Sequence, residues 1–154
     1  MKVILKAGVL FIFFLISTTA VAKKPATEAS TTDSVRGELV FIVAAKSPAR
    51  IDRRLLPMQK DLARAFAPKL NRFDFIESSF PALSKDVPRT ATLPGGGKLT
   101  MTYLGREGEY IVLKLELPEW SGQVRVKNGK RFFQAGRRYG DGILVIALRV
   151  TPMR

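Results

Sequence analysis

The amino-acid sequence predicts an α+β domain of mainly antiparallel β-sheet: a sandwich or partly rolled sheet of about eight strands, packed with one amphipathic helix. Three observations lead to this prediction. Two continuous apolar runs, 39–45 and 143–148, have the length and the β-branched content of buried strands. Period-two alternation of apolar and polar residues recurs between 72 and 133. Only the segment 52–68 has helical periodicity.

The predicted helix runs from about Asp52 to Pro68. Asp52 is a suitable N-cap, and Pro57 falls near the first turn, where a missing N–H does least harm. Apolar residues recur at three- and four-residue spacing and define a core-facing stripe: Leu55, Met58, Leu62 and Phe66. Three cations fall on the opposite side of the helix: Arg53, Lys60 and Arg64.

Alternation and turn residues predict how the strands connect. The segments 99–103 and 111–117 are expected to form an antiparallel hairpin. Asn128-Gly129 is the strongest short hairpin signal in the chain, so 123–127 and 130–133 are expected to pair with each other. The two continuous apolar runs are expected to lie side by side at the centre of the sheet.

The first 22 residues have the three zones of a secretion signal. Lys2 and Lys6 precede an apolar stretch, 7–16, and Ala20-Val21-Ala22 predicts cleavage between Ala22 and Lys23. The apolar stretch is about half of the roughly 20 residues that a membrane-spanning helix needs, which favours a cleaved leader over a retained anchor. We therefore expect export to the periplasm, the cell surface or the medium. A flexible polar tether over 23–36 and one globular domain over 37–150 are expected to follow.

The composition limits the chemistry that this chain can perform. The chain has a formal net charge of +13, which the loss of Lys2 and Lys6 would lower by two, to +11. Such a surplus favours anionic partners. The chain contains no cysteine and no histidine. Disulfides, catalytic triads that use histidine or cysteine, and histidine zinc sites are therefore excluded. We expect no cofactor, no metal and no catalytic residue.

Basic residues are the candidate binding site. One group lies on the predicted helix: Arg53, Lys60 and Arg64. A second lies on the late hairpin and the loop after it: Arg125, Lys127, Lys130, Arg131, Arg137 and Arg138. The sequence therefore predicts an exported, non-enzymatic envelope protein, an accessory or binding module that contacts an anionic envelope component or an acidic protein partner through these residues. The competing interpretation is an ordinary solvated surface.

Two other functions remain open from the sequence. Aromatic residues among the late cations would suit a single-stranded nucleic-acid binder: Phe132, Phe133 and Tyr139. Carboxylates near turns would suit an envelope glycan hydrolase: Glu107, Glu109 and Asp141. The Pro94–Gly97 segment is predicted to be a hairpin turn, because it lacks the spacing of a phosphate-binding loop. Trp120, the only tryptophan, is expected to plug the end of the core or to contact a partner.

Several stretches together resemble a group of short exported proteins of unassigned function in myxobacteria and related bacteria. The stretches that carry the resemblance are 43–46, 51–55, 73–76, 93–97 and 140–148. The resemblance covers about residues 38–150 and implies a shared envelope fold without assigning an activity or a site. The segment Gly136-Arg137-Arg138 is more basic than the corresponding stretch of that group.

Overall fold

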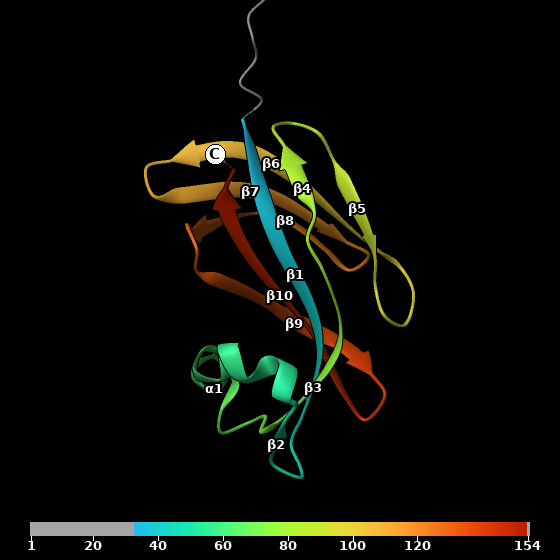
Figure 1. Cartoon of the computed structure of the whole chain (residues 1–154). Helices are drawn as coiled ribbons and strands as arrows, with labels where there is room; N and C mark the ends of the chain where they lie inside the picture. Colours follow the sequence, from blue (N-terminus) through green and yellow to red (C-terminus); the bar gives the residue numbers. More distant parts are fainter. Residues whose placement is uncertain (1–32, 154) are drawn as a thin grey trace, which may run out of the picture.

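The computed structural model describes residues 33–153 (Figure 1), so the predicted leader and its cleavage point between Ala22 and Lys23 lie outside the described residues. The elements follow in this order: β1 (Ser34–Ala45), β2 (Arg50–Ile51), the 3-10 helix η1 (Arg53–Met58), α1 (Gln59–Phe66), β3 (Arg72–Ser79), β4 (Ala82–Ser84), β5 (Arg89–Thr92), β6 (Lys98–Glu107), β7 (Tyr110–Leu117), β8 (Trp120–Lys127), β9 (Arg131–Tyr139) and β10 (Gly142–Pro152).

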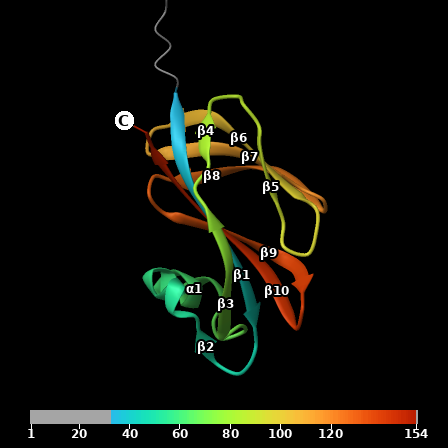
Figure 2. The same ribbon diagram turned by 45° about the vertical axis from the view of Figure 1, so that its right-hand side comes forward.

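The strands form two sheets, and the predicted sandwich with one packed α-helix is confirmed. One sheet has the order β2-β3-β1-β10-β9, with β4 paired to the start of β1, and the other has the order β5-β6-β7-β8. The four-stranded sheet lies beside the upper part of the long strands and α1 beside their lower part (Figure 2). A first core fills the space between the sheets, and a second core lies between the six-stranded sheet and α1.

The two apolar runs pair as predicted at the centre of the six-stranded sheet. β1 and β10 run antiparallel, with Leu39 opposite Leu148 and Val43 opposite Leu144. Both runs are apolar throughout because both faces of this sheet are covered: Leu39 belongs to the first core, and its neighbour Val40 to the second. β1 starts and β10 ends at the same pole of the molecule, and α1 lies at the other (Figure 1).

The folded domain begins earlier than predicted. β1 starts at Ser34, within the segment expected to be a polar tether, and Val35 is fully buried in the first core. Its backbone pairs with Leu83 of β4 on one side and with Pro152 of β10 on the other. A single valine between polar residues has no periodicity, so the sequence does not reveal that it is buried. The domain likewise extends two residues past the predicted end at 150.

The helical segment divides into η1 and α1, where the sequence predicts one continuous helix. Pro57 lies inside η1 and has no N–H for an α-helical bond, and the α-helix proper starts after it, at Gln59. The predicted stripe faces the second core: Leu55, Met58 and Leu62 are buried, and Phe66 packs against them partly exposed. Among residues 33–153, no helix is both long enough and apolar enough to cross a bilayer.

Asp52 is the N-cap of η1, as predicted, and its charge is held by Arg54. A carboxylate oxygen of Asp52 accepts the Arg54 backbone N–H at 2.9 Å, and the Arg54 guanidinium donates two more bonds at 3.1 and 2.7 Å. These hydrogen bonds, first those from the guanidinium and then that from the backbone, hold the pKa of Asp52 well below its usual range. The charged form of Asp52 therefore stabilises the fold.

We expect Asp52→Asn to lower stability at neutral pH and to have less effect in acid. Asparagine keeps the capping oxygen but has no charge to offer Arg54. A folded-state pKa below the unfolded value of about 3.9 gives stability that is present above that pH and lost as the pH falls below it. Urea unfolding of both proteins between pH 7 and pH 2 should show their stabilities converging below about pH 4. If the difference in unfolding free energy between the two proteins stays constant over this range, the charge of Asp52 does not stabilise the fold.

Asn128-Gly129 forms a turn, but the predicted hairpin around it is wrong. Lys130 N–H donates to Lys127 O at 2.9 Å across the turn, yet β8 pairs with β7 and β9 pairs with β10, in different sheets. Gly129 has φ 72°, while Asn128 is not among the residues with positive φ. A type I′ hairpin turn needs positive φ at both central positions, and turns with the opposite twist splay their strands. Here the splayed strands enter the two layers of the sandwich.

Candidate functional site

The three predicted helical cations are in exposed positions, Arg53 at the start of η1 and Lys60 and Arg64 in α1. Arg53, Lys60 and Arg64 are all exposed, and none forms an ion pair with a carboxylate between residues 33 and 153. Lys60 and Arg64 are four residues apart in α1 and therefore neighbours on one helix face. Leu56 of η1, half exposed, lies between Arg53 and Lys60 in the sequence. We call Arg53, Lys60 and Arg64 the α1 basic face.

The second predicted group is not one surface. Arg125 pairs with Glu107, and Lys127 with Glu109 at 3.0 Å, at the end of the β6–β7 hairpin. The hydrogen bond to Glu109 raises the pKa of Lys127. Lys130 and Arg138, near the two ends of β9, are exposed and form no ion pair with another described residue.

Arg131, also in the predicted site, has a structural position. Its side chain is only 12% exposed and lies 3.6 Å from Glu38 of β1 and 3.5 Å from Asp61 of α1. Glu38 also pairs with Arg149 of β10 at 2.7 Å. These four charged residues join three neighbouring strands to the helix. Arg131 is therefore committed to carboxylates within the fold, whereas the sequence places it on an anion-binding surface.

Arg137 is turned toward the interior side of the sandwich by a β-bulge. Along β9, the register with β10 shifts between Ala135, opposite Val145, and Arg137, opposite Leu144. The extra residue is Gly136, whose φ of 145° is open only to glycine. The bulge resets the alternation of side chains, so Arg137 falls on the same face as Leu144 of the first core.

From this position Arg137 reaches the glycine turn of the other sheet. It donates to Gly96 O at 2.6 Å and lies 3.5 Å from Glu119. A Cβ on Gly97 would lie 3.0 Å from the Arg137 guanidinium, so the turn approaches Arg137 as closely as glycine allows. The Pro94–Gly97 segment is a turn, as predicted, and it also approaches Arg137 and Tyr139 of β9 in the other sheet.

A pocket of about 250 Å³ lies where β8 and β9 separate, and we call it the β8–β9 pocket. Its apolar wall comes from the first core and the end of β7: Leu93, Leu117, Leu144 and Ile146. Trp120 of β8 lines it from one sheet, and Gln134 to Arg137 of β9 line it from the other. Trp120 is 37% exposed, so it does not plug the core but stands at an opening of it.

Gly122 and Gly136, to which the sequence assigned no role, shape this pocket. A Cβ at Gly122 would lie 2.5 Å from the Trp120 ring, so only glycine leaves the indole room to lie over β8. Gly136 makes the bulge that aims Arg137. A glycine inside an alternating strand is a recognised signal of a bulge or a close approach, and that signal could have identified both residues.

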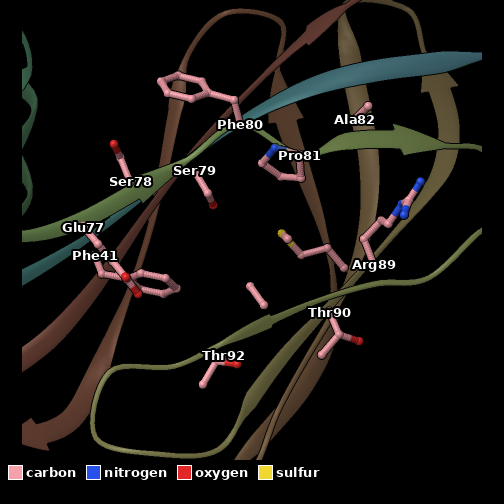
Figure 3. Close-up of a pocket in the computed structure, with 12 residues that line it drawn as sticks. Phe41, Glu77, Ser78, Ser79, Phe80, Pro81, Ala82, Arg89, Thr90 and Thr92 are labelled. Carbon is pink, nitrogen blue, oxygen red and sulfur yellow. The ribbon is translucent and has the colours of Figure 1, made fainter.

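A wider groove of about 640 Å³ lies on the opposite open side of the sandwich, between β3 and β5 (Figure 3). Its floor contains Phe41 and Met101, which are buried core residues of the two sheets. Its rims carry mainly hydroxyl side chains: Ser78, Ser79, Thr90 and Thr92. Phe80 stands at the edge of the groove and is 66% exposed. Glu77 is the only carboxylate that lines it.

The three aromatic rings of the nucleic-acid alternative do not form one stacking platform. Phe132 and Tyr139 pack against the first core, while Phe133 packs against the second, on the other face of β9. The Phe133 ring also meets Phe66 of α1 edge-on, with ring centroids 5.7 Å apart. All three rings are partly buried, whereas stacking on single strands needs exposed rings on one surface.

The carboxylates of the hydrolase alternative lie apart and are each held by a cation. Glu107 and Glu109 are at the β6–β7 turn, whereas Asp141, between β9 and β10, accepts a 2.5 Å bond from Arg72. That bond lowers the pKa of Asp141, where a catalytic acid needs a raised one. Between residues 33 and 153, no group of three acidic residues is placed to hold a metal ion.

Comparisons with protein-family models, with curated proteins and with solved structures returned no match. The resemblance to short exported myxobacterial proteins therefore stays a prediction. Within residues 33–153, the geometry defines a β-sandwich that has a pocket at one open side, a wider groove at the opposite side and a cationic helix face.

Proposed function

We propose that this chain is an exported, non-enzymatic binding module of the cell envelope. It holds an anionic envelope component or an acidic protein partner on the α1 basic face. Export is expected from the leader pattern of residues 1–22, and the charge surplus of the chain fits an anionic partner. The module would act as an accessory to a larger assembly.

One observation carries this proposal: the cations of the α1 basic face are exposed and have no carboxylate partner between residues 33 and 153. Most carboxylates between residues 33 and 153 already form ion pairs, for example Asp61 with Arg131 and Asp52 with Arg54. Asp61 of α1 thus faces Arg131 of β9, and Asp52, the N-cap of η1, faces Arg54. The charged groups of η1 and α1 that are left for an external partner are therefore positive, and the exposed apolar Leu56 lies between two of them in the sequence.

The ion pairs of the later cations exclude most of them from the proposed site. Cations that already face carboxylates gain little from a second anion, because the new contact replaces an existing one. Arg125, Lys127, Arg131 and Arg137 belong to this paired set. Arg53, Lys60 and Arg64 can bind an external anion without breaking a described ion pair.

Reversal of the α1 basic face tests the proposal. We expect the triple variant Arg53→Glu, Lys60→Glu, Arg64→Glu to lose binding to vesicles of phosphatidylglycerol and to an immobilised polyaspartate at about 0.15 M salt. Sedimentation and column retention measure the two probes. Binding of the unmodified protein should weaken as salt is added, because exposed charges are screened.

A matched variant distinguishes the contribution of the α1 basic face to binding from that of the net charge. Lys85→Glu, Arg89→Glu, Lys98→Glu changes the charge of the chain by the same amount, at three exposed cations away from the helix. We expect this variant to keep most of the binding. Equal losses in the two triple variants would show that net charge alone drives retention, and the proposed site would be wrong.

A further inference from the structure

We propose that the β8–β9 pocket is a peptide-docking site. It takes one aromatic side chain from an extended acidic segment of a partner protein, and that segment adds as a strand to the free edge of β9. This site is separate from the α1 basic face and does not depend on it.

The size and lining of the pocket fit a single apolar side chain. Its volume of about 250 Å³ is below the range of roughly 300–1,000 Å³ that is typical of sites for small molecules and cofactors. Its wall is made of Leu93, Leu117, Leu144 and Ile146, and its polar groups lie on β9 and at Glu119. A dry apolar pocket with a polar rim is the setting in which one buried anchor residue dominates a protein interface.

Trp120 makes an aromatic anchor the best fit. The indole lies over Gly122, where a Cβ would come within 2.5 Å of the ring, and it lines the pocket while remaining 37% exposed. An incoming ring can pack against the indole offset or edge-on, which adds to the free energy of burial. A large aromatic side chain held open at the mouth of an apolar pocket is also costly to leave in water, unless a partner covers it.

The edge of β9 supplies the backbone partner. β9 is the last strand of its sheet and pairs only with β10, and the neighbouring edge strand β8 belongs to the other sheet. Within the described chain, no backbone group from Arg131 to Tyr139 bonds to anything but β10. An extended peptide could therefore take up the outward N–H and C=O groups. Alternate side chains of an added strand point to one face, here toward the pocket.

The charges along β9 select an acidic segment. Lys130 precedes the strand and Arg138 lies near its end, both exposed and without an ion pair to another described residue. Gln134, which lines the pocket, is midway between them in the sequence. A strand with its aromatic residue opposite Gln134 would bring carboxylates three or four positions away within reach of both cations.

Binding at the pocket can be followed by the fluorescence of Trp120, because it is the only tryptophan in the chain. The probe is a capped seven-residue peptide with a central phenylalanine, threonine at the intervening positions and aspartate at both ends. We expect its titration to change the tryptophan fluorescence saturably, with a dissociation constant below about 1 mM. Replacing the phenylalanine by alanine, or both aspartates by lysine, should weaken binding at least tenfold.

Two pairs of variants locate the binding. Gln134→Phe fills the pocket and should abolish the response, while Gln123→Phe, on the outer face of β8, should keep it. Gly122→Ala displaces the indole, a movable side chain, so the fold should survive while the response is lost. Its control is Ser121→Ala, at the neighbouring exposed position. Binding that persists in Gln134→Phe and in Gly122→Ala overturns the pocket assignment.

Backbone methylation tests the added strand. Two versions of the peptide carry N-methyl groups on alternate residues, so that one has them on the N–H groups that face β9 and the other on the N–H groups that face solvent. The version methylated on the N–H groups that face β9 should bind at least tenfold more weakly than the other. Equal binding of both versions, or no response from the parent peptide at 1 mM, overturns the proposal. The triple variant of the α1 basic face should bind the peptide normally, which distinguishes failure of this site from failure of the proposed function.

Discussion

Leu62→Ala should destabilise the domain by about 2–5 kcal/mol, the largest single effect that we expect. Leu62 is fully buried and fixes α1 to the six-stranded sheet, within the cluster that contains Val40, Ile42 and Val145. The substitution removes apolar contacts and leaves a cavity that a short helix between two fixed ends cannot close. Urea unfolding, followed by far-UV circular dichroism, gives the free energy of unfolding.

The control for Leu62→Ala is Lys60→Ala on the same helix. Lys60 is exposed and has no described ion pair, so its loss should change stability by no more than about 0.5 kcal/mol. Both substitutions place alanine in α1, and both keep good helix propensity. Similar losses in the two variants would mean that the helix contributes little through packing, contrary to the structure.

Arg131→Ala should lower the free energy of unfolding by about 1–3 kcal/mol. The change removes the cation that lies between Glu38 and Asp61, and the Glu38 side chain is only 20% exposed. Arg149 remains near Glu38, which limits the loss. The substitution also removes the aliphatic part of the Arg131 side chain and the packing that it provides.

Arg125→Ala is the matched control for Arg131→Ala. Arg125 also lies on a strand and pairs with a glutamate, but its side chain is 62% exposed. Exposed ion pairs contribute about 0–1 kcal/mol, so this variant should stay close to the parent protein. If the two arginine variants were equally stable, the ion pairs of Arg131 would be ordinary surface contacts, and its place in a binding surface would have to be reconsidered.

The long and repetitive elements of this fold could be predicted from the sequence. β1 and β10 are apolar because they are covered on both faces, and the β6–β7 hairpin alternates because one of its faces is in the core. β2 and β4 were not predicted, since two- and three-residue strands carry no periodicity. The prediction of a hairpin at Asn128-Gly129 was wrong because the same dipeptide also fits a turn whose flanking strands enter different sheets.

The candidate sites could be predicted only in part. The exposed cations of the helix follow directly from its periodicity, since residues opposite a buried stripe face solvent. Whether a cation between 125 and 138 forms an ion pair depends on the tertiary structure. Arg131 and Asp61 are far apart in the sequence and meet only because α1 packs beside β9. The β8–β9 pocket was missed for the same reason, because the assumed hairpin would have closed the gap in which the pocket lies.

The positions of residues 33 and 153, the first and last that the structure describes, have a consequence for the orientation of the domain. Residues 33 and 153 are at one pole, and the α1 basic face is at the other (Figure 1). Twelve residues of β1 run most of the way between the poles, a distance of about 40 Å. A domain fastened to a surface directly at residue 33 or residue 153 would therefore point its cationic helix away from that surface, toward whatever lies across the intervening space.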